Sequence, residues 1–187
     1  MAILLLCAFS MTAQIKVGKY KEWKKTIDVL EVKEAYDFST RKTVVILPVA
    51  TSDVELPEKS NDNYKLITKS LENMTQMVAN QMKKDLEKQG YKVIVAENAD
   101  YRDPEAIVIQ LNWTELDLGS RALRAWVGFG AGNAKFGTSG VIYDGDNEVI
   151  TFSHRRIAPL DTQKYEKLLE KGVNNVVSDV AKLVIAL

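Results

Sequence analysis

The stretch Thr43 to Ala50, TVVILPVA, decides the fold of this chain. It is apolar and rich in β-branched residues throughout, a pattern typical of a strand buried on both faces of a sheet. The polar segment 51–63 follows, contains Pro57 and predicts a long loop. We therefore expect the sheet to be built around the strand at Thr43 to Ala50.

A long amphipathic helix is predicted from Lys65 to Lys88. Apolar side chains recur there at steps of three and four residues, while lysines and acids fill the other face. The apolar positions are Ile67, Leu71, Met74, Val78, Met82 and Leu86. Gly90 predicts the end of the helix, because glycine readily adopts the left-handed conformation that follows a last turn. We interpret the methionines as core packing rather than as a binding groove.

A second apolar strand, Tyr91 to Ala96, follows the helix directly. Strand, helix and strand in this order predict a crossover unit with parallel strands. Ala106 to Leu118 then alternates between apolar and polar residues, as a half-buried strand does. Ala134 to Tyr143 and Glu148 to Ile157 are joined by Asp-Gly-Asp-Asn, which predicts a β-hairpin.

A last amphipathic helix is introduced by Pro159 and Asp161. Gly172 lies inside this helix, and glycine there lowers the stability of the helix by about 1 kcal/mol relative to alanine. We interpret this glycine as a site of close packing on the sheet. The predicted fold class is therefore α/β (α+β mixed): a single mixed β-sheet with two amphipathic helices packed on it and a C-terminal β-hairpin.

Length and charge bound the class of protein. The chain has 187 residues, and residues 43–187 are predicted to form a single α/β domain of unknown function. Lysine plus arginine and aspartate plus glutamate each number 25, so the formal net charge is zero. Because a nucleic-acid-binding domain is usually clearly basic, we expect no nucleic-acid partner.

The N-terminus carries an export signal in our interpretation. Ala2 to Phe9, AILLLCAF, is too short to span a bilayer, so we predict a signal peptide over residues 1–13. The alternative is a buried N-terminal strand. Cys7, the one cysteine, raises the question of a lipoprotein, but Leu6 stands where lipid attachment normally requires a small residue. We expect a periplasmic or outer-membrane-associated protein.

Residues 14–42 form a basic N-terminal segment. Five lysines, with Tyr20 and Trp23 between them, lie at positions 16, 19, 21, 24 and 25. Such a segment can lie on an anionic membrane surface, so peripheral membrane contact is one interpretation, and a solvated leading segment is the other. Ile27 to Val32 is a candidate first strand.

The candidate contact surface is the segment from Ser120 to Gly132. Its residues of interest are Arg121, Arg124, Trp126, Gly128, Gly130 and Gly132. Glycine at alternate positions removes the side chains from one side of an extended segment, so another backbone or a ligand can approach closely. The arginines either hold a carboxylate or phosphate, or pair with Glu115, Asp117 or a neighbouring subunit.

Patterns for cofactor, metal and catalytic sites are incomplete. The glycines at 128–132 do not match the spacing of a dinucleotide fingerprint, and no phosphate-loop lysine follows them. His154 is the only histidine, and we interpret it as structural because a metal or catalytic site would need partners. Asp144 to Asn147 resembles a calcium loop only in part and is interpreted as a turn. We predict no catalytic residues, no metal and no cofactor.

The residues from Asp117 to Phe136, DLGSRALRAWVGFGAGNAKF, resemble the signature of an uncharacterised bacterial envelope family, domain of unknown function 4410. The similarity in the order of elements covers roughly residues 43–157. The resemblance implies an exported or lipoprotein α/β domain, similar to the N-terminal domain of TolB-like proteins and to curli-secretion lipoproteins. It brings no catalytic residues.

We therefore expect an exported, non-catalytic envelope protein that binds a protein partner or self-associates through residues 120–132. The alternative is a binder of a small anionic ligand, or a hydrolase, that uses Arg121 and Arg124 in the same segment. We expect no transmembrane helix beyond the leader.

Overall fold

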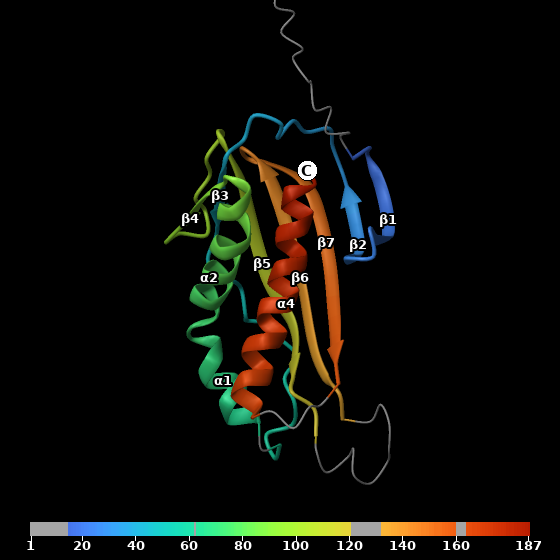
Figure 1. Ribbon diagram of the computed structural model, residues 1–187, viewed down its shortest axis with the longest axis vertical. Coiled ribbons are helices and arrows are strands. Elements are labelled where there is room, and N and C mark those ends of the chain that lie inside the picture. The colour runs from blue at the N-terminus through green and yellow to red at the C-terminus, as the bar shows by residue number, and fades with distance from the viewer. Residues whose placement is uncertain (1–14, 62, 121–131, 160–163) are drawn as a thin grey trace, which may run out of the picture.

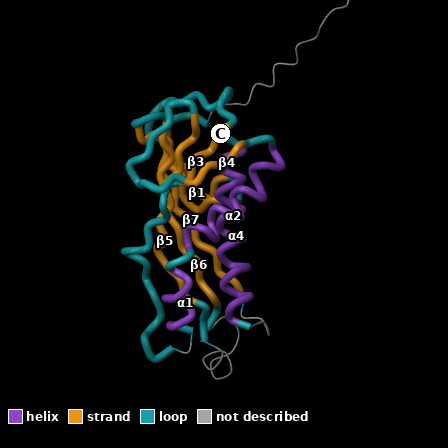
Figure 2. Tube along the Cα trace, turned by 90° about the vertical axis from the view of Figure 1, so that its left-hand side faces the viewer, coloured by secondary structure: helices purple, strands orange, loops and turns teal. Residues whose placement is uncertain are grey.

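A computed structural model describes residues 15–61, 63–120, 132–159 and 164–187. Seven strands form one sheet, with helices layered on one of its faces (Figures 1 and 2). The strands are β1 (Gly18–Trp23), β2 (Ile27–Val32), β3 (Thr43–Ile46), β4 (Lys92–Val95), β5 (Ala106–Asp117), β6 (Ala134–Asp144) and β7 (Asn147–Ala158). The helices are α1 (Tyr64–Leu71), α2 (Met74–Leu86) and α4 (Tyr165–Ile185), with a short 3-10 helix at Glu87–Gln89.

The strand order across the sheet is β1-β2-β7-β6-β5-β3-β4. β3 is parallel to both β4 and β5, and the other neighbours are antiparallel, so the sheet is mixed. The predicted crossover is confirmed, because α1 and α2 connect β3 to its parallel neighbour β4. The predicted hairpin is confirmed as β6 and β7, which turn through Gly145 at a φ of 61°. The predicted α/β class is therefore confirmed.

The helix predicted over residues 65–88 is in fact two helices. α1 ends at Leu71 and α2 begins at Met74, and Asn73 between them has non-helical angles, φ −108° and ψ 10°. The apolar spacing continues across this break because residues on both sides remain buried, so the spacing alone does not reveal it. Gly90 ends the segment in the left-handed conformation, with φ 83°, as predicted.

The sheet begins at Gly18, one strand before the candidate first strand at Ile27–Val32. The candidate strand at Ile27–Val32 is present as β2, which pairs antiparallel with β7 and buries Leu30 beside Phe152. β1 pairs with β2 and forms one free edge of the sheet (Figure 1). The N-terminal hairpin is thus built into the sheet by its backbone.

The main core lies between the sheet and the helices α2 and α4. Trp113 and Phe136 are among the largest fully buried side chains, and Met74 and Met82 are fully buried as core residues. A Cβ at Gly172 of α4 would overlap the ring of Phe136 on β6. The close helix-to-sheet packing inferred for this glycine is therefore confirmed.

β3 is buried on both of its faces, as its sequence predicts. Val44 and Ile46 pack into the main core, whereas Val45 and Leu47 belong to a smaller cluster. That cluster also contains Val108 of the neighbouring strand β5. β3 is therefore a central strand of the sheet, between β5 and the short edge strand β4.

Candidate functional site

The base of the segment 120–132 is a narrow neck formed by two glycines. Gly119 and Gly132 both have positive φ, 73° and 74°. The Ser120 N–H donates to the Gly132 carbonyl oxygen at 3.2 Å. A Cβ on Gly119 would overlap the Gly132 carbonyl, and a Cβ on Gly132 would overlap the Ser120 carbonyl. The close backbone approach predicted for the alternating glycines 128, 130 and 132 is therefore present at Gly132.

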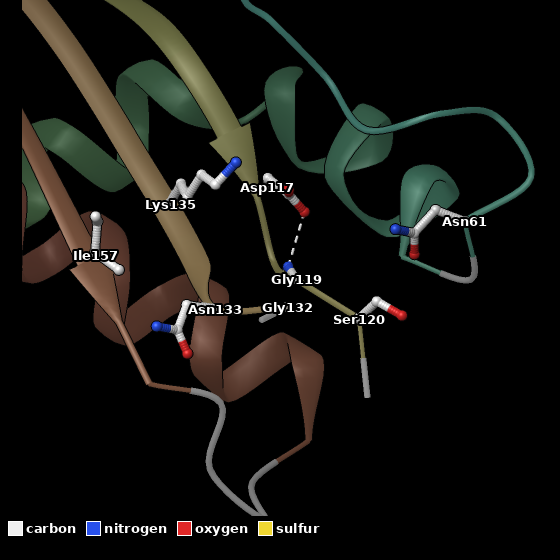
Figure 3. A pocket seen from close by; sticks show the side chains of 8 residues that line it. All are labelled: Asn61, Asp117, Gly119, Ser120, Gly132, Asn133, Lys135 and Ile157. Atoms are coloured by element: carbon white, nitrogen blue, oxygen red, sulfur yellow. Dashed lines mark hydrogen bonds between the residues drawn. The ribbon is translucent and has the colours of Figure 1, made fainter. Parts of the chain in front are cut away.

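Two side chains fix the neck from outside. The Asp117 carboxylate at the end of β5 accepts a hydrogen bond from the Gly119 N–H at 2.8 Å (dashed in Figure 3). The Asn63 amide, fully buried just before α1, donates to the Gly119 carbonyl at 2.8 Å. The Asn63 Oδ1 has no hydrogen-bond partner among the described residues. The neck is thus held both by its own strand and by a residue 56 positions away.

A pocket of about 360 Å³ lies beside the neck (Figure 3). Its lining residues are Asn61, Asp117, Gly119, Ser120, Gly132, Asn133, Lys135 and Ile157. The lining carries both charges, a carboxylate from Asp117 and an ammonium from Lys135. Lys135 is already 3.6 Å from the Glu115 carboxylate. The charge facing the pocket is therefore mixed rather than clearly cationic.

The Glu115 carboxylate on β5 is bound by two cations, Lys135 of β6 and Arg155 of β7. Arg155 contacts it at two points, Nε to Oε2 at 2.6 Å and Nη2 to Oε1 at 3.0 Å. This hydrogen-bonded pair, aided by the charge of Lys135, holds the pKa of the Glu115 carboxyl below its ordinary value despite partial burial. One of the two acids considered as partners for Arg121 and Arg124 is therefore already occupied by other cations.

His154 and Asp179 are the buried members of a second polar cluster. The His154 Nε2 is 3.2 Å from Asp179 Oδ2 on α4, and its Nδ1 is 3.4 Å from Asp28 Oδ2 on β2. Arg156 and Lys182 also contact Asp179, each at 2.9 Å. Burial raises the pKa of Asp179, but the hydrogen bonds from His154 and Lys182 and the charge of Arg156 outweigh it and lower the pKa. The cluster joins α4 to β7 and β2.

Most of the predicted contact residues fall outside the part of the chain that the structure describes. These are Arg121, Arg124, Trp126, Gly128 and Gly130, whereas Gly132 is described. Sequence reasoning missed Gly119 and Asn63. The Asp-Leu-Gly run at the end of the β5 sequence is a local turn signal for Gly119. No local signal identifies Asn63, because its contact depends on the tertiary fold.

Within residues 15–61, 63–120, 132–159 and 164–187, no group of three or more histidine, cysteine, aspartate or glutamate side chains is placed to hold a metal ion. Among the helices in those ranges, none combines the length and the apolar character that a membrane crossing requires.

The matched family model places the chain in a known group. The chain belongs to the family described as domain of unknown function (DUF4410), whose model matches residues 44–171. A comparison with curated proteins found no match. The family resemblance noted in the sequence is therefore confirmed.

Several solved structures are similar to this chain at low sequence identity. The PelC dodecamer from Paraburkholderia phytofirmans is 13% identical with a TM-score of 0.44, over 80% of this chain and 96% of that one. A protein from Xanthomonas campestris is 9% identical with a TM-score of 0.47, over 83% and 92%. Lipoprotein GNA1162 from Neisseria meningitidis is 15% identical with a TM-score of 0.41, over 76% and 97%.

Proposed function

We propose that this protein is an exported, non-catalytic protein of the cell envelope. It binds a protein partner or a second copy of itself through the segment 120–132. The observation that carries this proposal is the neck, in which Gly119 and Gly132 hold the two ends of the segment backbone to backbone. A segment with fixed ends loses less conformational freedom on binding than a free one, which favours association.

The residue types in the segment suit a protein interface. Arginine and tryptophan are the residues most often found at the energetic centres of interfaces. Arg121, Arg124 and Trp126 lie within six positions of each other in the sequence. Export is inferred from the apolar run at Ala2–Phe9, which is followed by small and polar residues.

The test is the solution mass of residues 14–187, measured by light scattering after size exclusion. The Arg121→Ser/Arg124→Ser variant is compared with the unchanged chain. Lys69→Ser/Lys167→Ser is the matched control, because it removes the same charge from two exposed helix-side positions. A defined oligomer that is lost only in the arginine variant supports the proposal. A monomer in all three samples contradicts self-association.

The second candidate function is the binding of a small anion at the pocket beside the neck. The pocket volume of about 360 Å³ and the Lys135 side chain favour it. The Asp117 carboxylate in the same lining and the pairing of Lys135 with Glu115 oppose it. Calorimetric titration with inorganic phosphate tests this candidate. Saturable binding that Lys135→Gln abolishes supports it, and the absence of any heat of binding contradicts it.

A further inference from the structure

The free edge formed by β1 carries an unusual concentration of one charge. Residues 15–27 contain five lysines and one glutamate, which gives a net charge of +4 in a chain whose total is zero. The lysines are Lys16, Lys19, Lys21, Lys24 and Lys25, and all are exposed. None of the five forms an ion pair with a carboxylate among the described residues. Elsewhere in the sheet, charges such as those of Arg155 and Arg156 are paired.

Two of these lysines, Lys24 and Lys25, lie in the turn of the β1–β2 hairpin in a backbone conformation that is rare for residues with a Cβ. Glu22, Lys24 and Lys25 have φ values of 48°, 47° and 57°, and they are the non-glycine residues with positive φ in the described chain. Side chains with a Cβ rarely adopt this conformation, and such outliers concentrate at functional positions. Trp23 is buried beneath this turn, with the Lys24 ammonium 4.8 Å from its ring centre.

An exposed apolar side chain lies within the same basic stretch. Val17 is 60% exposed, the highest value among the large apolar residues that the structure describes. It stands next to Lys16 and two positions from Lys19. Lysines flanking an exposed apolar residue match what an interfacial surface needs, since the ammonium groups meet the headgroups while the apolar group enters the acyl boundary.

We propose that the β1–β2 hairpin is a docking surface for an anionic lipid membrane. The basic residues of the segment 15–33 are all lysines, with no arginine. This composition favours an anionic lipid surface over an acidic protein as the partner. Lysine is a flexible point charge that suits a diffuse anionic surface, whereas arginine is preferred for two-point recognition of single carboxylates. This surface is separate from the segment 120–132 and does not depend on what that segment binds.

Edge protection is the competing explanation for the lysines. Lysine on an exposed edge strand discourages pairing with another chain. Edge protection by itself would therefore explain the positive charge on β1. It does not account for Lys24 and Lys25, which lie in the turn beyond the strand, or for the exposed Val17. The two explanations also differ in what the removal of the lysines changes: lipid binding in one case, aggregation in the other.

The experiment is co-sedimentation of the full chain with vesicles of 30% phosphatidylglycerol in phosphatidylcholine, and with pure phosphatidylcholine as the neutral reference. The test variant is Lys19→Gln/Lys21→Gln/Lys24→Gln. The matched control is Lys69→Gln/Lys88→Gln/Lys167→Gln, which removes three exposed lysines from the helices. The N-terminal apolar run is the same in every sample, so differences between variants come from the lysines.

We expect the hairpin variant to bind anionic vesicles at least tenfold more weakly, since each lysine near such a surface contributes about fivefold. The control should stay within about twofold, and added salt should release the unchanged chain. Equal losses in both variants would overturn the proposal in favour of diffuse attraction. Aggregation or a changed solution mass of the hairpin variant, with lipid binding intact, would overturn it in favour of edge protection or a protein interface.

Discussion

The carbonyl oxygen of Gly132 occupies the space that a side chain on residue 119 would need. The two residues belong to opposite ends of the same segment, and the hydrogen bond from Ser120 to Gly132 closes the neck at 3.2 Å. This contact positions Ser120 and Gly132, which flank residues 121–131, relative to the sheet. It is therefore the structural basis of the proposed binding function.

Replacement of Gly119 by alanine tests the neck directly. The new Cβ would meet backbone, which cannot rotate away, and the φ of 73° is unfavourable for any residue with a Cβ. We expect the free energy of unfolding to fall by about 2–4 kcal/mol in chemical denaturation. Gly90→Ala is the control, because Gly90 has φ 83° but nothing within 4 Å of a built Cβ. The Gly90→Ala change should lower the free energy of unfolding by only about 1–2 kcal/mol. Equal losses in the two variants would show that the overlap with the Gly132 carbonyl does not destabilise Gly119→Ala.

Replacement of Gly172 by alanine should also destabilise the protein, against the intrinsic preference of helices. Alanine in a helix interior is favoured by about 1 kcal/mol over glycine. A Cβ here would overlap the Phe136 ring, so we expect a net loss of about 1–3 kcal/mol in denaturant unfolding. Lys171→Ala, at an exposed neighbouring position, should change the stability by no more than about 0.5 kcal/mol. A stabilised Gly172→Ala protein would contradict the tight packing of α4 on β6.

The buried carboxylate of Asp179 should make stability depend on pH in the acid range. Its pKa is lowered in the folded protein, so its contribution is present above the ordinary value of about 4 and is lost as the pH falls through the folded pKa. We expect the free energy of unfolding to decrease between about pH 5 and pH 3, and the decrease to be smaller in Asp179→Asn. Asp146→Asn, on the exposed turn, is the control and should keep the slope of the unchanged chain.

The pair between Glu115 and Arg155 should contribute modestly to stability. Glu115 is mostly buried, but the Arg155 side chain is 48% exposed, so solvent screens the interaction. We expect a coupling free energy of about 1 kcal/mol from a double-mutant cycle with Glu115→Gln and Arg155→Gln. The coupling should shrink in high salt. Strictly additive losses would show that the two side chains do not interact in solution.

Most elements of this fold were predictable because they have a strong local pattern. The β-branched run of β3, the glycine after α2 and the Asp-Gly turn between β6 and β7 all act over a few residues. β1 was not predicted as a strand, because its lysine-rich sequence lacks apolar alternation. It exists through backbone pairing with β2, which a periodicity argument does not register.

The candidate site was predictable only in part. The alternating glycines at 128, 130 and 132 indicated a close backbone approach, and Gly132 makes such an approach to Ser120. The partner glycine at 119 and the anchor at Asn63 depend on contacts between distant parts of the chain. The same holds for the charged cluster, in which His154 of β7 meets Asp179 of α4 and Asp28 of β2. Sequence spacing carries no information on such contacts.

The most direct test of the central claim is the solution mass of residues 14–187, followed over a range of protein concentrations. The account predicts a defined oligomer for the unchanged chain and for Lys69→Ser/Lys167→Ser, and a monomer for Arg121→Ser/Arg124→Ser with its fold intact by circular dichroism. An oligomer that persists unchanged in the arginine variant, or a monomer in every sample, would contradict assembly through this segment.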